Sequence, residues 1–126
     1  MSAFRRFFTG VTDTGEHVKE EHLRTRYYRG EQKKVCQEVV QFAREAKDVQ
    51  LVHVNESRGE VMMEYRDPLG LKHDIVVTVY AITPVQSAVD LHVALRSRFV
   101  DFGFNPKLVA RVYHYLDRKL TPLERA

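Results

Sequence analysis

Apolar and polar residues alternate along five stretches of this chain, and a period of two predicts β-strands. The stretches are residues 23–28, 49–55, 60–66, 72–83 and 87–99. The last one alternates most regularly. Its apolar side carries Val89, Leu91, Val93 and Leu95, and its polar side carries Asp90, His92, Arg96 and Arg98.

The strand predicted over residues 49–55 has two competing apolar sets. Val49 and Leu51 make up one set, and Val52 and Val54 make up the other. Because successive side chains of a strand point to opposite faces, only one set can be buried in a regular strand. The pattern leaves the buried face of this strand open.

A period of 3.6 residues predicts two helices, one over residues 31–46 and one that begins near residue 105. Asn105 is a preferred N-cap residue, and Pro106 suits the first helical position. Gly103 permits a tight reversal with positive φ before the second helix. We therefore interpret Asp101, Gly103 and Asn105 as turn and cap residues.

The predicted elements follow one another as β-α-β-β-β-β-α, with short connections typical of antiparallel neighbours. We predict an α+β fold: a single five-stranded antiparallel sheet with two helices on one face, where each helix buries its apolar stripe. Residues 21–126 would form this domain, and residues 1–20 an N-terminal arm. The order resembles that of one repeat of the TATA-box-binding protein. It resembles more loosely the helix-grip domains, which bind apolar ligands between sheet and helix.

Length and composition agree with one globular domain. The chain has 126 residues, of which 44% are hydrophobic and 29% charged. Its single cysteine, Cys36, cannot form an intramolecular disulfide, which favours a reducing compartment, and we expect the cytoplasm. The net charge of +3 is uneven: +2 over residues 1–29, −3 over 30–93 and +4 over 94–126. Positive ends favour an anionic partner only weakly, because a solvated basic surface explains them as well.

The sequence offers no convergent set of catalytic residues. The six histidines show no spacing typical of a metal site, and no P-loop, dinucleotide-binding glycine motif, nucleophile elbow or CxxC is present. Asp90 and His92 share a strand face, and His73 could join them from a neighbouring strand. A hydrogen-bonded surface pair explains this arrangement better than an acid–base or ligand pair. We expect no enzyme, no metal and no cofactor.

A small binding or interaction module remains the best hypothesis, with a protein partner or a second copy of the chain as its ligand. A basic module that binds nucleic acid or an anionic lipid surface is the first alternative, and an apolar ligand between the sheet and the C-terminal helix is the second. Arg24 and Arg26 fit the first alternative, but such residues also protect an edge strand from aggregation. The predicted contact surface comprises Arg24, Arg26, Arg66, Tyr80, His92, Arg96 and Arg98.

The start of the chain places Phe4, Phe7 and Phe8 at the spacing of one helical turn, with two arginines between them. A basic aromatic turn can lie on an anionic membrane surface. Because this one is very short, we favour contact of the phenylalanines with the domain itself or with a partner subunit.

The residues around the last turn resemble a family motif. Ser97-Arg98, then Asp101-Phe102-Gly103-Phe104-Asn105, and then Val109 are similar to the terminal S-R…D-x-G-x-N…V pattern of the bacterial proteins grouped as domain of unknown function 1499. Members of that family are about as long as this chain. The resemblance covers the last third of the chain in detail and implies no particular activity.

Overall fold

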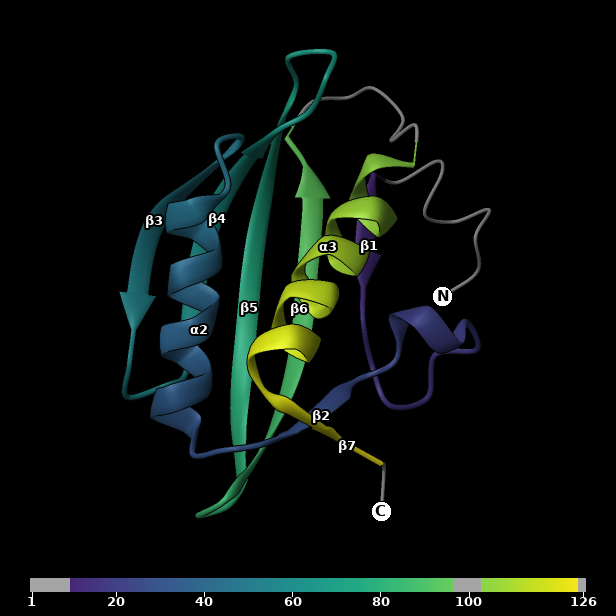
Figure 1. The fold of residues 1–126 in the computed structure, drawn as a ribbon. Coiled ribbons are helices and arrows are strands. Elements are labelled where there is room, and N and C mark those ends of the chain that lie inside the picture. The colour runs from purple at the N-terminus through teal and green to yellow at the C-terminus, as the bar shows by residue number, and fades with distance from the viewer. Residues whose placement is uncertain (1–9, 97–102, 125–126) are drawn as a thin grey trace.

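The computed structural model describes residues 10–96 and 103–124 (Figure 1). Its elements, in chain order, are strand β1 (Val11–Asp13), the 3-10 helix η1 (Glu21–Leu23), strand β2 (Arg26–Arg29), helix α2 (Gln32–Glu45), strands β3 (Val49–Asn55), β4 (Glu60–Arg66), β5 (Lys72–Thr83) and β6 (Gln86–Leu95), helix α3 (Phe104–Lys119) and strand β7 (Thr121–Leu123).

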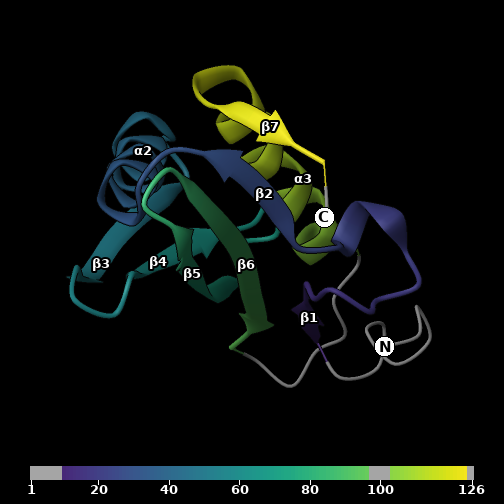
Figure 2. The same cartoon turned by 90° about the horizontal axis from the view of Figure 1, so that it is seen from below.

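The seven strands form one sheet, in which neighbouring strands run antiparallel in the order β3-β4-β5-β6-β2-β7, and β1 also pairs with β6. Both helices lie on the same side of this sheet (Figure 2). The predicted α+β class, with an antiparallel sheet and two helices, is therefore confirmed. The predicted number of strands was wrong: five were predicted, and residues 10–96 and 103–124 form seven.

The two unpredicted strands are three residues long and depend on distant partners. β1 pairs with the second half of β6, where Thr12 lies opposite Val93, and β7 pairs with β2. Because β1 belongs to the sheet and Thr12 is fully buried, residues 10–20 are part of the domain rather than an arm. Phe4, Phe7 and Phe8 lie outside the described residues.

The first predicted strand, residues 23–28, is also corrected. Leu23 belongs to η1, and the strand begins only at Arg26. β2 lies between β6 and β7, so it is not an edge strand. The arginines of this segment therefore do not protect a sheet edge.

A β-bulge decides the buried face of β3. The register with β4 shifts between Leu51 and His53, so Val49 and Leu51 face the helices before the shift and Val54 faces them after it. Val52 is left 61% exposed at the bulge. Each of the two competing apolar sets is thus buried in part.

The core lies between the helices and the sheet. Val77, Val79 and Leu91 line it from β5 and β6, while Val39 of α2 and Val112 of α3 cover them, and all five are at most 2% exposed. Within residues 10–96 and 103–124, the helices lack the length and hydrophobicity that a bilayer-spanning helix needs. The packing of apolar faces against one another supplies the main driving force for this arrangement.

The start of α3 differs from the prediction. Gly103 has φ of 90°, as expected, but it is itself the N-cap residue, and the helix begins at Phe104. Asn105 therefore lies inside the first turn rather than at the N-cap position. It is fully buried and bonds to other parts of the chain. Asp101 lies outside the described residues.

Candidate functional site

The side of the sheet away from α2 and α3 carries no helix of the described chain (Figure 2). Along β4, β5 and β6 its side chains alternate with those of the core, because successive strand residues point to opposite faces. We call this surface the open face, and its side chains include those of Met62, Glu64, Arg66, Lys72, Asp74, Val76, Thr78, Tyr80, Asp90, His92 and Arg96.

One end of the open face is charged. Arg96 bonds to Asp74 and, at 3.1 Å, to Glu64, which also lies 3.4 Å from Lys72. Hydrogen bonds from Arg96 lower the pKa values of both carboxyl groups. All four side chains contact water, so salt screens the network and it contributes little to stability.

The other end of the sheet, where β5 turns into β6, exposes large apolar side chains. Tyr80 is 48% exposed, Ile82 52% and Val85 65%. We call these three residues the apolar end. Ala88 of β6 pairs with Tyr80 of β5 on one side and with Tyr27 of β2 on the other. Ala88 lies between the two tyrosines and is only 3% exposed. An exposed cluster of this kind is typical of a contact surface.

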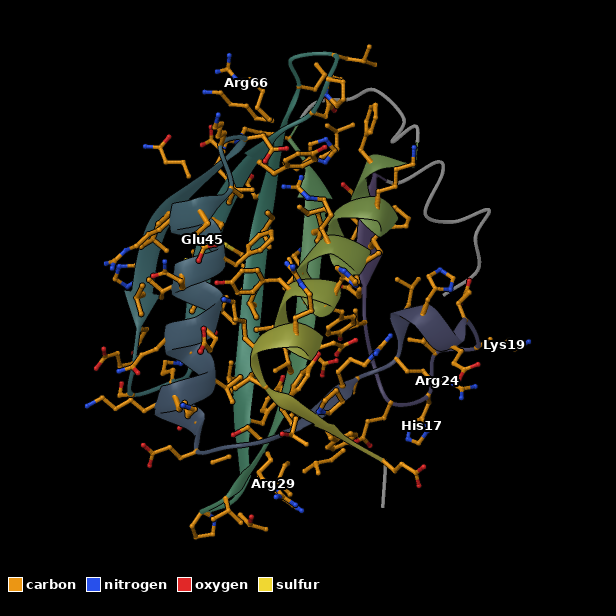
Figure 3. All side chains as sticks on the ribbon, in the orientation of Figure 1. His17, Lys19, Arg24, Arg29, Glu45 and Arg66 are labelled. Carbon is orange, nitrogen blue, oxygen red and sulfur yellow. The ribbon has the colours of Figure 1, made fainter. Side chains whose placement is uncertain are left out.

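The predicted contact residues do not all meet on one surface. Arg26 points to the helix side, where it lies 3.3 Å from Asp117 and 4.9 Å from the ring centre of Tyr113. Arg24 is exposed beside η1, far from Arg66, as Figure 3 shows. Arg98 lies outside the described residues. Four of the seven predicted residues belong to the open face: Arg66, Tyr80, His92 and Arg96.

The suggested convergence of Asp90, His92 and His73 is wrong. His73 pairs with Leu95 in register, and its side chain points into the core, on the opposite face from the other two. Asp90 accepts hydrogen bonds from two threonine hydroxyls at 2.7 Å each, and His92 bonds to Asp13. The strand alternation itself separates these groups.

Instead, His73 belongs to a buried polar cluster that the sequence did not reveal. Its Nε2 atom lies 2.7 Å from the Oδ2 atom of Asp67, and its Nδ1 atom bonds to the Oδ1 atom of Asn105. His73 and Asn105 are fully buried, and Asp67 is 4% exposed. The cluster thus joins the turn between β4 and β5, strand β5 and the first turn of α3.

Asn105 and Asp67 have further hydrogen-bond partners outside the cluster. The Nδ2 atom of Asn105 donates to the carbonyl oxygens of Gly10 at 2.9 Å and Val93 at 3.2 Å, so its Oδ1 atom faces His73 as an acceptor. Asp67 accepts two backbone N–H bonds, at 2.8 and 3.1 Å, within its own turn. Burial opposes its charge, but the hydrogen bonds from His73 and the turn outweigh this and lower the pKa of Asp67.

One signal in the sequence could have placed His73. His73 is separated by an even number of positions from Ile75, Val77 and Val79 along β5, so it lies on the same face as these buried residues. A histidine at such a position needs polar partners in the core. The local sequence pattern does not identify those partners, because it predicts Asp67 to be a turn residue and Asn105 to be a helix cap.

In residues 10–96 and 103–124 no group of three or more His, Cys, Asp or Glu side chains could hold a metal ion. Burial raises the pKa of the Cys36 thiol to about 11, which disfavours the reactive thiolate at neutral pH.

Comparison with models of known protein families, with curated proteins and with solved structures finds no match for this chain.

Proposed function

We propose that this chain is a protein-binding module that works through the open face of its sheet together with the apolar end, and that it carries out no chemistry. The observation that carries the proposal is the apolar end, where Tyr80, Ile82 and Val85 are all about half exposed or more. A surface that combines an apolar cluster with charged, hydrogen-bonding side chains has the usual composition of a protein contact surface. The partner is a protein, and we propose a second copy of this chain as the first one to test.

The arginines favour a protein over nucleic acid. Arg96 already bonds to Asp74 and Glu64, and Arg26 lies beside Asp117. A phosphate backbone would have to displace these carboxylates. The alternative of an apolar ligand between sheet and α3 has less support, because α3 buries Leu108, Val109, Val112 and Leu116 almost completely against the core.

The family, the location and the resemblance of the element order are also matters of proposal. We propose kinship with the family grouped as domain of unknown function 1499, on the motif around Gly103 and Asn105. We propose a cytoplasmic location, which the buried free thiol of Cys36 supports. The order of β2, α2, β3 to β6 and α3 resembles one repeat of the TATA-box-binding protein, but a shared order of elements does not carry function.

The test is the molar mass of the purified protein in solution across a range of concentrations, at low and high salt, with absorbance at 260 and 280 nm. We expect a dimer that salt does not dissociate, and a monomer for the variant Ile82→Asp. Leu69→Asp is the matched control, because Leu69 is a 62% exposed apolar residue in the turn at the other end of the sheet. It should leave the dimer intact.

Two results would contradict the proposal. Co-purified nucleic acid that high salt removes would favour the basic module instead. If wild type is a monomer at every concentration, immobilised wild type and Ile82→Asp are compared as baits. Equal retention of the same proteins by both baits would exclude the apolar end as the contact surface.

A further inference from the structure

Strand β3 offers a free backbone edge on a different side of the molecule from the open face. It ends the sheet and, in residues 10–96 and 103–124, pairs only with β4 (Figure 1). The backbone amide of Arg66 donates to the carbonyl of Asp48 at 3.0 Å, so the backbone groups of Asp48 point toward β4. Because alternate residues of an antiparallel strand point their backbone groups to opposite sides, the N–H and C=O of Leu51 point away from β4. Such an edge can accept another strand.

A groove of about 320 Å³ runs between this edge and α2. Its apolar lining comes from Cys36 and Val40 of α2 and from Leu51 and Val54 of β3, which are buried or half-buried. A strand added alongside β3 would point every second side chain toward α2 and into this groove. Backbone bonds together with a pocket for alternate side chains are the two requirements for recognition of a peptide by strand addition.

The charges on the rim differ between the two ends of the groove. Lys33 and Arg44 line it from α2, eleven positions apart, which is about 16 Å along a helix and the length of about five strand residues. Neither forms an ion pair within the described chain. Glu56 lines the end near Lys33, whereas no carboxylate lines the end near Arg44. The Arg44 end therefore suits an acidic side chain.

A second copy of this chain fits the edge poorly. If β3 paired with β3 of another copy about a two-fold axis, the two α2 helices would lie side by side and antiparallel. Lys33 of one copy would then approach Arg44 of the other, and like charges repel. The bulge between Leu51 and His53 also interrupts a long ladder. A short extended segment avoids both problems.

We propose that the groove between α2 and β3 binds, by strand addition, a short extended acidic segment of another protein. Its acidic residue lies toward Arg44, and an apolar residue two positions away fills the space over Val40 and Leu51. This surface is separate from the open face and goes beyond the function proposed above.

The experiment selects a displayed library of random seven-residue peptides on the wild-type protein. The expected result is enrichment of peptides with an acidic residue two positions from an apolar one. The best peptide is then synthesised and titrated into wild type and three variants. Arg44→Glu should weaken binding about tenfold, as reversal of one exposed charge pair allows. Val40→Lys should abolish it, and Lys34→Glu, the same charge change outside the groove, should leave affinity within about twofold.

Backbone amide shifts in the same titration locate the peptide. Shifts concentrated on β3 and α2 support the proposal, whereas shifts on the open face would overturn it. It would also be overturned if no acidic and apolar pattern were enriched, or if Arg44→Glu bound the peptide as tightly as wild type. Ile82→Asp should bind the peptide normally, so this proposal and the one for the open face fail independently.

Discussion

His73 and Asp74 are adjacent in the sequence, yet they belong to two polar clusters with opposite environments. His73 points into the core, where it contacts Asp67 and Asn105 and no water. Asp74 points to the open face, where it contacts Arg96 and is exposed to solvent. The two clusters lie on either side of the same end of the sheet, so their difference isolates the effect of burial.

Burial makes the inner cluster indispensable and the outer network replaceable. A buried polar group that loses its partner cannot turn to water, whereas an exposed one can. The inner cluster also connects α3 to β5, because Asn105 lies 32 positions from His73 in the sequence, whereas the outer network connects strands that already pair. We therefore expect the largest effects of substitution on the inner side.

The largest effect is expected for His73→Leu. This change removes the partner of the buried Oδ2 atom of Asp67 and one partner of Asn105, and removal of one partner of a buried pair typically costs about 3–5 kcal/mol. Urea unfolding followed by circular dichroism measures the loss. Asp74→Leu is the adjacent control on the exposed side. Equal losses for the two variants would show that burial does not separate the clusters.

Asn105→Ala should cost less than His73→Leu but more than the loss of a helix cap. It removes the acceptor for His73 and the donor for two backbone carbonyls, which we expect to cost about 2–3 kcal/mol. A residue that acted only as a cap would cost about 1 kcal/mol. The same urea titration distinguishes the two roles, with Lys107→Ala as an exposed control in the same turn of α3. A loss near the lower value would argue against the buried role.

Acid should destabilise the protein partly through Asp67. Its pKa in the folded chain is lowered below the unfolded value, so its contribution is present above about pH 3.9, the ordinary value for Asp, and is lost as the pH falls through the folded pKa. We expect the unfolding free energy of wild type to fall more between pH 6 and pH 3 than that of Asp67→Asn. Identical losses in both proteins would assign the acid sensitivity to other carboxylates.

The smallest effect is expected for Asp74→Asn. The pair with Arg96 is exposed and screened, so the midpoint of urea unfolding should stay within the error of the measurement, at low salt and at 1 M NaCl alike. A clear loss at low salt that disappears at high salt would show that the outer network does stabilise the fold.

Sequence periodicity was sufficient to predict most of the framework. The alternation along β6 placed Val89, Leu91, Val93 and Leu95 in the core, where all four are buried. The 3.6-residue period located α2 and α3 to within two residues of their observed starts, because a single apolar stripe marks a helix that packs on one face. The same alternation placed His92 and Arg96 on the polar side, which is the open face.

The candidate sites were predicted less well, for a physical reason. His73 was predicted to lie near Asp90 and His92, although it is two positions from Ile75 along β5 and therefore lies on the inner face. Arg26 was assigned to a contact surface although Asp117, which lies 91 positions away in the sequence, holds it on the helix side. A local sequence pattern cannot predict contacts between residues that lie this far apart in the chain.

The sequence alone thus determined the class of fold, the two helices, the central strands and the sides on which their residues lie, because these depend on local periodicity. Only the tertiary structure decided the rest. β1 and β7 are too short to show a period and exist because β6 and β2 offer partners. The bulge in β3 decided which of its valines are buried, and packing of the first turn of α3 against β5 turned Asn105 from an expected cap into a buried partner of His73.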